Sequence, residues 1–300
     1  MTKPVLVRNP NGGDRRKSVK ARDIARRRGY DVRNSTARGE TLSLAEAAAR
    51  DGASVIAACG GDGTLNEVVR GVDAAGALDD VRLGVIPTGT GNDFADNLGI
   101  RGLSHAFDVV ESGEERRLDL GMADDRPFVN SCVGGLTAEA SARTTPERKR
   151  RLGVLAYVLS TLHEAREFDG LRLDVRAGPR DDPIWSGEAE MILIGNARRF
   201  PGERERRANV EDGLLNVVII ERAPSLDYLS AGAVEVLLRR DSTYLSRLKV
   251  PRLHLEHDGD PVQFSLDGEM VQRAEMDVRC RPNAMRFAVG ERYVPNRSGR

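Results

Sequence analysis

The first 120 residues of the chain alternate between short apolar runs and longer stretches with the periodicity of amphipathic helices. Apolar runs at residues 5–7, 54–58 and 81–86 each lead into a glycine-containing loop and then into a helical pattern. A further strand is predicted at residues 30–33 and a further helix at residues 41–50. This alternation favours an α/β domain with a mainly parallel sheet. Ligands bind such domains at the carboxyl ends of the strands.

After about residue 120 the pattern changes to short strand-like runs separated by Gly, Pro and Asp turns. Helices are predicted only at residues 153–168 and 225–239. The predicted strands are residues 128–133, 171–176, 189–194, 214–220, 253–257, 262–266 and 276–280. Many short strands with turn signals are typical of an antiparallel β-sandwich or open barrel.

Two domains are therefore expected. The α/β domain would comprise residues 1–121 and the β-rich domain residues 122–283, and a C-terminal segment at 284–300 could return to the first. The fold class is α/β with a C-terminal antiparallel β-sandwich-like domain.

The loop after the second apolar run has three glycines in residues 60–63. Glycine lets the backbone approach a ligand closely and adopt positive φ. Thr64 and Glu67 have the spacing of a capping box, so Thr64 is predicted to be the N-cap of the next helix. Such a helix start suits a phosphate, and Asp62 then makes sense if a Mg²⁺ ion lies between carboxylate and phosphate. The alternative is an ordinary glycine-rich surface turn.

Two further loops have a similar character. Residues 9–13 read Asn-Pro-Asn-Gly-Gly, and the loop after the third apolar run combines two glycines with Thr90, Asn92 and Asp93. These polar side chains suit a nucleotide and its metal ion. No Walker phosphate loop is present, and Phe94 stands where a dinucleotide fingerprint needs its third glycine.

Composition and charge narrow the class of protein. The 46 basic residues balance 46 acidic ones, so the net charge gives no case for a nucleic-acid partner. Three widely spaced cysteines indicate a reducing cytoplasm and neither a disulfide framework nor a zinc site. No apolar run approaches the ~20 residues of a membrane span. We therefore expect a soluble, cytoplasmic protein without a transmembrane segment. The oligomeric state is open, so a homo-oligomer remains an option.

Basic residues gather at 148–151 and 198–207, where they could meet anionic headgroups at a membrane surface. A solvated face is the simpler interpretation of both runs. Residues 211–214 and 266–269 each place carboxylates beside a turn glycine. An Asp-Gly pair between apolar runs is first of all a hairpin signal.

Together these motifs resemble those of the soluble bacterial diacylglycerol kinases, within the diacylglycerol/sphingosine kinase superfamily. The resemblance rests on residues 60–67, the loop 87–94, the late Asp-Gly-Glu at 267–269 and the opening Asn9-Pro10-x-x-Gly13. These motifs follow in the right order along nearly the whole chain. Residues 134–137 lack the Phe-Asp that many members carry, and residues 203–207 are charged in place of a glycine-rich apolar stretch. Both departures lie in the second domain.

The resemblance implies an ATP-dependent lipid kinase that transfers the γ-phosphoryl group to a lipid hydroxyl, with diacylglycerol or a related glycerolipid as acceptor. Its active site is expected in the cleft between the nucleotide-binding domain and the β-rich domain, with Asp62 among the catalytic residues. The implied ATP-binding residues are Asn9, Pro10, Asn11, Gly12, Gly13, Gly61, Asp62, Gly63, Thr64, Leu65, Asn66, Glu67 and Thr90. Thr36 is a weaker match, because the spacing after it is one residue short.

Other residues follow from the same resemblance. The Asp-Gly-Glu segment would supply the base, with Asp267 as the orienting group and Glu269 as the proton acceptor. A second, structural Mg²⁺ ion is expected at the main chain of Asn209 and Leu214 and the carboxylate of Asp212. The lipid substrate would be met at the membrane surface, with the protein bound peripherally.

Two alternatives remain at this stage. An NAD kinase or another small-molecule kinase shares the Gly-Gly-Asp-Gly loop, but it is not expected to carry the Gly-Thr-x-Asn-Asp-Phe loop. A catalytically silent nucleotide-binding regulator would bind ATP without turnover.

Overall fold

The computed structural model describes residues 3–10, 12–37, 39–89, 91–135, 170–178, 182–197, 208–222, 244–257 and 259–295. The chain divides into two compact units. The first comprises residues 1–120, 209–213 and 281–300, and the second residues 121–208 and 214–280. The helices predicted at 153–168 and 225–239 and the basic runs at 148–151 and 198–207 lie outside the described residues.

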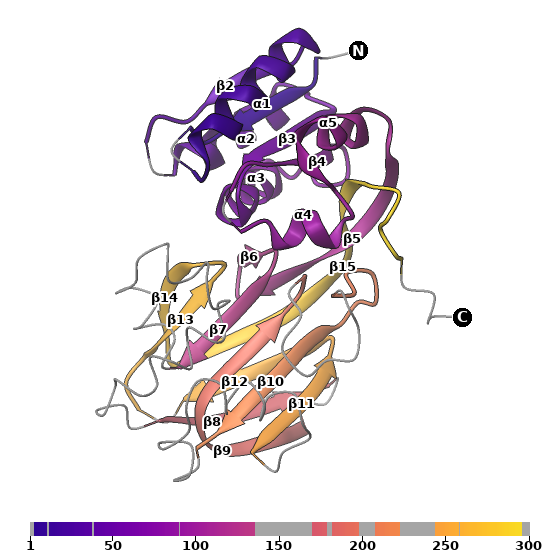
Figure 1. Cartoon of the computed structure of the whole chain (residues 1–300). Helices are drawn as coiled ribbons and strands as arrows, with labels where there is room; N and C mark the ends of the chain where they lie inside the picture. The colour runs from indigo at the N-terminus through magenta and orange to yellow at the C-terminus, as the bar shows by residue number, and fades with distance from the viewer. Residues whose placement is uncertain are drawn as a thin grey trace. The chain divides into compact units, whose positions relative to one another are not determined.

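The first unit contains a parallel sheet (Figure 1). Its strands are β1 (Val5–Arg8), β2 (Asp31–Asn34), β3 (Val55–Gly60) and β4 (Arg82–Pro87). They lie in the order β2-β1-β3-β4, and every neighbouring pair is parallel. The last part of β15 (Glu275–Val289) adds a parallel strand beside β4. The predicted α/β class with a mainly parallel sheet is confirmed.

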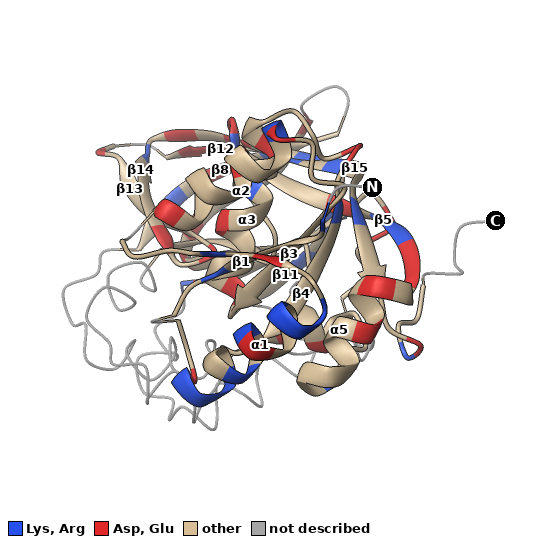
Figure 2. Cartoon of the chain, turned by 90° about the horizontal axis from the view of Figure 1, so that it is seen from above, with Lys and Arg blue, Asp and Glu red and all other residues tan. Residues whose placement is uncertain are grey.

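Helices cover both faces of this sheet. They are α1 (Arg15–Arg27), α2 (Glu40–Arg50), α3 (Asp62–Ala74), α4 (Asp93–Asn97) and α5 (Gly102–Ser112). Helices α2 and α3 pack together on one face, and α1 and α5 lie on the other (Figure 2). Because all the strands are parallel, the loops after β1, β3 and β4 lie at one edge of the sheet, the carboxyl edge.

Helix α1 shows how the sequence sets these elements. The Asp14 carboxylate accepts hydrogen bonds from the backbone N–H groups of Arg16 (2.8 Å) and Lys17 (3.2 Å), which caps the helix start. Its buried residues, Ser18, Ala21 and Ala25, form one stripe against the sheet.

The predicted N-cap of α3 is wrong. The helix begins at Asp62, with Gly61 in an extended conformation as its N-cap, so Thr64 lies inside the first turn. A Cβ placed on Gly60 would lie 2.2 Å from the Thr64 hydroxyl oxygen. The Thr64 side chain therefore packs onto the glycine backbone, and the helix starts three residues earlier than predicted.

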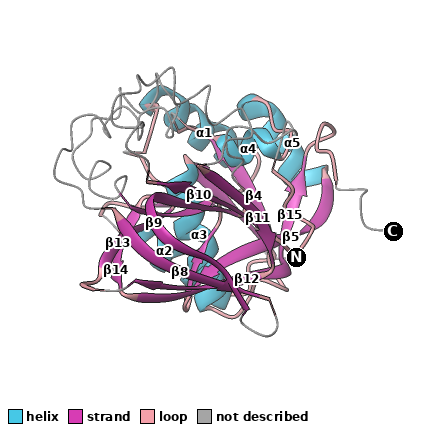
Figure 3. Ribbon diagram, turned by 90° about the horizontal axis from the view of Figure 1, so that it is seen from below, coloured by secondary structure: helices cyan, strands magenta, loops and turns pink. Residues whose placement is uncertain are grey.

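The second unit is an antiparallel β-structure (Figure 3). Its strands run in the order β14-β13-β7-β9-β8-β12-β15, with β10 and β11 continuing from β9. Their bounds are β7 (Ser131–Gly135), β8 (Leu171–Ala177), β9 (Asp182–Gly195), β10 (Leu215–Glu221), β11 (Leu245–Val250), β12 (Arg252–His257), β13 (Val262–Leu266) and β14 (Glu269–Arg273). One buried cluster, which includes Ile192, Leu255 and Phe264, forms its core. The β-sandwich-like C-terminal domain is thus confirmed.

Two strands stand where the sequence predicts a single one at residues 128–133. They are β6 (Arg126–Phe128), which pairs with β5 (Glu114–Ala123), and β7, which pairs with β9 and β13. Between β6 and β7, the backbone N–H groups of Val129 and Asn130 donate to a distant carboxylate, Asp267, and not to a neighbouring strand. This explains why the apolar run is interrupted.

In the described ranges, none of the helices combines the length and the apolarity needed to cross a bilayer.

Candidate active site

Three glycine loops touch one another at the carboxyl edge of the first unit. Gly13, Gly61 and Gly89 come from the loops that follow β1, β3 and β4. A Cβ on Gly89 would lie 2.3 Å from the Cα of Gly61, and one on Gly13 would lie 2.4 Å from the carbonyl oxygen of Thr88. Gly13 also has a φ of +91°. Glycine is required here because backbone packs directly on backbone.

Backbone hydrogen bonds hold the three loops in place. The N–H of Asn9 donates to the carbonyl of Cys59 (3.2 Å), the N–H of Thr88 to that of Gly60 (2.9 Å), and the N–H of Asp14 to that of Thr88 (2.8 Å). Burial raises the pKa of the Cys59 thiol to about 11, so this cysteine carries no charge at neutral pH. The loops therefore form one fixed polar surface without a reactive thiolate.

Asp62 connects two of these loops. Its carboxylate accepts hydrogen bonds from the backbone N–H groups of Asp93 (3.2 Å) and Phe94 (3.3 Å), the first residues of α4. The side chain is thereby held at the point where the loops after β3 and β4 meet. The same contacts cap α4, so Asp62 has a structural role in addition to any chemical one.

The other predicted residues of the third loop have backbone partners. The amide of Asn92 donates to the carbonyl of Gly89 (2.9 Å), and its Oδ1 accepts from the N–H of Gly89 (3.2 Å). Asn92 therefore shapes the glycine loop. Thr90, like Asn11 of the first loop, lies outside the described residues.

Thr36 follows β2 at the same edge of the sheet, and its hydroxyl donates to the Glu40 carboxylate at 2.9 Å. Hydrogen bonds from the backbone and side chain of Thr36 and from the backbone of Ala37 lower the pKa of Glu40. This contact orders the start of α2.

Helix α3 becomes buried from its third residue onward. Thr64, Leu65 and Asn66 are each less than a tenth exposed, whereas Gly63 is exposed with open space above it. Leu65 thus belongs to the core. The buried Oδ1 of Asn66 has no hydrogen-bond partner in the described structure, and a buried unpaired acceptor is expected to have a ligand or water as its partner.

These groups fit a nucleotide with a divalent ion. One carboxylate, an unpaired amide oxygen and the N-terminus of α3 lie together at the glycine loops. Mg²⁺ is typically held by one or two carboxylates plus phosphate oxygens. The described residues contain no group of three or more His, Cys, Asp or Glu side chains placed to hold a metal, which such a phosphate-bridged ion does not require.

The second predicted metal site comprises residues of the segment 209–214. The Oδ1 of Asn209 accepts from the N–H of Glu211 at 3.1 Å, which fixes this turn. Asp212 belongs to the same segment, and Leu214 begins the second unit. The predicted ligands therefore share one short turn, but their metal role remains a prediction.

Asp119, which the sequence reading missed as a site residue, supports this turn. Its carboxylate accepts from the N–H groups of Gly213 (2.7 Å) and Asn283 (2.8 Å). Only 1% of the residue is exposed, and burial raises its pKa. A lone carboxylate between Leu118 and Leu120 was the signal in the sequence.

In the second unit, Asp267 and Gly268 form the two-residue turn between β13 and β14, with φ of 49° and 96°. The hairpin interpretation is therefore right, and the Asp267 side chain also binds the backbone of a neighbouring loop. Its carboxylate accepts from the N–H groups of Val129 (2.6 Å), Asn130 (3.0 Å) and Ser131 (2.8 Å). Glu269 is only partly exposed and pairs with Arg126 at 2.6 Å.

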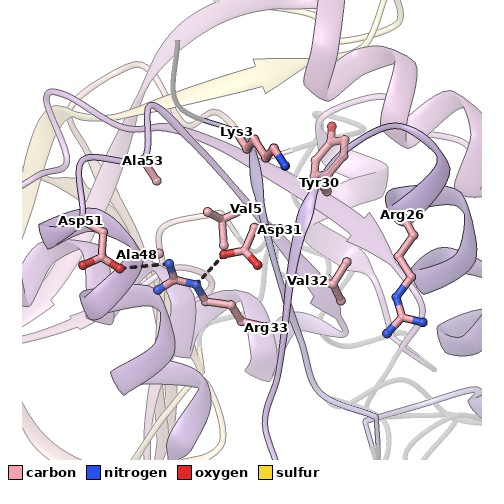
Figure 4. Close-up of a pocket in the computed structure, with 10 residues that line it drawn as sticks. All are labelled: Lys3, Val5, Arg26, Tyr30, Asp31, Val32, Arg33, Ala48, Asp51 and Ala53. Carbon is pink, nitrogen blue, oxygen red and sulfur yellow. Dashed lines mark hydrogen bonds and ion pairs between the residues drawn. The ribbon is translucent and has the colours of Figure 1, made fainter.

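A hollow of about 560 Å³ lies elsewhere in the first unit, at the amino ends of β1 and β2 (Figure 4). Arg33 crosses it between the carboxylates of Asp31 (3.0 Å) and Asp51 (3.0 Å). None of the predicted site residues lines this hollow. It lies at the opposite ends of the strands from the glycine loops.

Comparison with known proteins agrees with this geometry. A family model described as "Diacylglycerol kinase catalytic domain" matches residues 3–123. One described as "YegS C-terminal NAD kinase beta sandwich-like domain" matches residues 130–289.

Individual relatives point the same way. A protein of Pseudomonas putida named "Probable lipid kinase YegS-like" is 31% identical over 257 residues, covering 85% of this chain and 83% of that protein. A protein of Staphylococcus epidermidis named "Diacylglycerol kinase" is 34% identical over 188 residues, covering 62% of this chain and 58% of that protein.

A crystal structure described as a diacylglycerol kinase from Bacillus anthracis strain Sterne has a TM-score of 0.75 at 20% identity, covering 97% of this chain and 98% of that one. At this identity the likeness concerns the fold alone. The family models and the Pseudomonas relative show more: this chain is a kinase that belongs to the YegS-like lipid kinases of the diacylglycerol kinase family.

Proposed function

We propose that this kinase phosphorylates the hydroxyl group of diacylglycerol or a closely related glycerolipid, with ATP as the phosphoryl donor. The contact of three glycine loops at one sheet edge carries the proposal, because phosphoryl transfer depends mainly on positioning and charge neutralisation. The name of the Staphylococcus relative supports diacylglycerol as acceptor.

The first unit binds the nucleotide in this proposal. The loop residues Asn9, Gly12, Gly13, Gly61 and Gly63 present backbone groups to the phosphates, and the N-terminus of α3 adds its positive dipole end. The Asn66 amide oxygen, which is unpaired in the described structure, is available to the metal shell or its water. Thr36, which follows β2, would also contact the nucleotide.

Asp62 would hold the metal ion, which we infer to be Mg²⁺. When bound, a divalent ion neutralises phosphate charge and orients the γ-phosphoryl group. Asp62 is suited to this because two backbone N–H groups fix its carboxylate. At residues 209–214 we infer a second, structural Mg²⁺ ion, held by the main chain of Asn209 and Leu214 and the carboxylate of Asp212, which would stabilise the turn.

The second unit supplies the acid–base groups. Glu269 accepts the proton of the lipid hydroxyl, and its contact with Arg126 fixes the position of the carboxylate. Asp267 is a positioning residue, because its oxygens are already occupied by backbone N–H groups of the 129–131 loop. A weakly basic carboxylate suffices, since a loose phosphoryl-transfer transition state demands little proton abstraction in advance.

We further infer peripheral association with an anionic membrane. Helix α1 carries seven basic residues and a single acid in 13 positions (Figure 2). The six exposed cations among them are Arg15, Arg16, Lys17, Lys20, Arg26 and Arg27. In a chain with zero net charge, this local excess supports a membrane surface as the partner.

An ATP-consumption assay against a panel of acceptors tests the proposal. Diacylglycerol or an ether-linked glycerolipid should give the highest turnover. Higher turnover with sphingosine or undecaprenol would show that the acceptor belongs to a different lipid class. Turnover only with NAD would indicate a small-molecule kinase, and ATP binding without turnover for any acceptor would indicate a silent regulator.

A further inference from the structure

Arg8, the last residue of β1, is a buried cation at the carboxyl edge of the first unit's sheet. Only 5% of the residue is exposed. Its Nε donates to the carbonyl oxygen (3.1 Å) and the hydroxyl (2.9 Å) of Ser18, and its Nη1 donates to Oδ1 of Asn34 (2.8 Å). All three acceptors are neutral. In the part of the chain that the structure describes, no carboxylate forms an ion pair with Arg8.

The surroundings disfavour a positive charge at this place. Burial is the main cause that lowers the pKa of Arg8. Cys59 and Asp23 raise this pKa, and the nearby Arg22 and Arg26 lower it further. The Cys59 thiol brings no charge at neutral pH. Ser18 lies in the first turn of α1, whose dipole presents its positive end there. A buried charge whose hydrogen-bond acceptors are all neutral is costly, so a cation kept here calls for an anion that arrives from outside the fold.

The place of Arg8 indicates which anion this is. Asn9, the next residue, opens the first glycine loop, and its N–H is bonded to the carbonyl of Cys59 (3.2 Å) at the end of β3. The carbonyl of Arg8 accepts from the N–H of Ser35 (2.9 Å), beside Thr36. The guanidinium thus lies beneath the first turn of the helix that follows the glycine loop.

We propose that Arg8 is an ATP-binding residue whose counter-ion is the phosphate chain of the nucleotide. The inference rests on the proposed function only in that ATP is the ligand of this sheet edge. Arg8 adds a fixed positive charge to the α1 N-terminus, and the resulting field selects polyphosphate over uncharged nucleoside. The buried charge destabilises the nucleotide-free protein, and bound ATP offsets this destabilisation.

The test compares the Arg8→Met variant with the unchanged protein by calorimetric titration with ATP and with adenosine, in Mg²⁺ buffer and without lipid. We expect ATP to bind roughly 10-fold to 100-fold more weakly, as for the loss of a contact to a charged group. Adenosine affinity should not change. The melting temperature of the nucleotide-free protein should stay the same or rise, and its increase on adding ATP should shrink. Arg8→Lys, which keeps the charge, should recover most of the ATP affinity.

Arg50→Met is the matched control, because it removes one exposed arginine charge from α2 of the same unit and should leave ATP binding unchanged. If Arg8 only ties α1 to β2, Arg8→Met will melt lower or fail to fold, and folded protein will bind ATP normally; either result overturns the inference. Equal losses in Arg8→Met and Arg50→Met would also overturn it. If the unchanged protein binds no ATP, the proposed function itself fails, which is a separate result.

Discussion

At the residue scale, the two roles of Asp62 can be separated by one substitution. Asp62→Asn should lower turnover by roughly 10²-fold or more, because a lost metal-binding charge removes several kcal/mol of transition-state stabilisation. The fold should stay intact with a stability loss of about 0.5–2 kcal/mol, since the asparagine oxygen can accept from only one of the N–H groups of Asp93 and Phe94, which bond to different oxygens of Asp62. Steady-state kinetics and thermal melting measure both. Normal Mg²⁺-dependent turnover would remove the metal role, and Asp23→Asn on α1 is the control.

The acids of the Asp-Gly-Glu turn should respond differently from one another. Glu269→Gln should reduce turnover by roughly 10² to 10⁴, about 3 to 5 kcal/mol of barrier, with unchanged ATP affinity. Glu275→Gln, an exposed acid on β15, is the control.

Asp267→Asn should also lose stability, by about 1–3 kcal/mol, because the neutral side chain leaves N–H groups of the 129–131 loop less well satisfied. Turnover and denaturant-induced unfolding of Glu269→Gln and Asp267→Asn decide which acid accepts the proton and which one positions the loop. If both retain near-normal turnover, the turn is a plain hairpin and the second unit is not part of the chemistry.

Some of these residue roles could be predicted from the sequence and others could not. The glycines and Asp62 were identifiable, because close backbone approach and a carboxylate among phosphate-facing turns leave a local signature. The amide partners of Asp267 lie more than 130 positions away, so no local pattern reveals them. Asp119 leaves only a weak signal in the sequence, as a carboxylate between two leucines, and Arg8 is an ordinary strand residue there; their burial distinguishes both in the structure.

At the scale of single elements, the loop contacts make one glycine far more sensitive than its neighbour. Gly89→Ala would place a Cβ 2.3 Å from the Cα of Gly61, whereas at Gly91 the nearest atom is Oδ2 of Asp62 at 3.9 Å. Gly89→Ala should destabilise the protein by about 1–3 kcal/mol, as overpacking does, and weaken ATP binding. Gly91→Ala should do neither. Equal melting temperatures and ATP affinities for the two variants would contradict the loop contact.

The start of α2 should depend on pH through Glu40. Its pKa is lowered from 4.5 by Thr36 and Ala37, so its stabilising contribution is present above the unfolded pKa and is lost as the pH falls through the folded one. Glu40→Gln should therefore melt lower than the unchanged protein at neutral pH, and the difference should disappear once the pH falls below the lowered pKa of the folded protein. A difference that persists in acid would show that charge is not the cause.

The elements themselves were predictable where local periodicity and turns agree. Strands β1 to β4 and helices α1 to α3 follow the pattern closely. Strand β5 was missed because it begins with charged Glu114–Arg117, and β14 because it continues from the turn with mixed polarity. Strand β5 pairs with β6 and with the distant β15, and β14 pairs with β13 in a hairpin. These pairings outweigh the weak local preference of both segments for a strand.

For the molecule as a whole, membrane association should depend on where the charge lies, because the net charge is zero. A basic residue near an anionic surface contributes about 1 kcal/mol. Removing Lys20 and Arg27 together, as Lys20→Gln/Arg27→Gln, should weaken binding to vesicles of 30% anionic lipid by roughly 30-fold at low salt. Exposed Arg50 and Arg252 lie outside α1, so Arg50→Gln/Arg252→Gln removes the same charge and should bind like the unchanged protein.

Salt separates this electrostatic contact from binding through the lipid substrate. The contribution of α1 should fall steeply as ionic strength rises, because the screening length shrinks from about 30 Å at 0.01 M salt to about 10 Å at 0.1 M. Co-sedimentation with anionic and neutral vesicles at both salt concentrations measures it, without diacylglycerol in the membrane. If the protein binds both vesicle types equally at both concentrations, or if the two double variants behave alike, α1 is only a solvated face. Turnover on diacylglycerol in detergent micelles should be the same for both double variants, because neither changes a residue of the proposed active site.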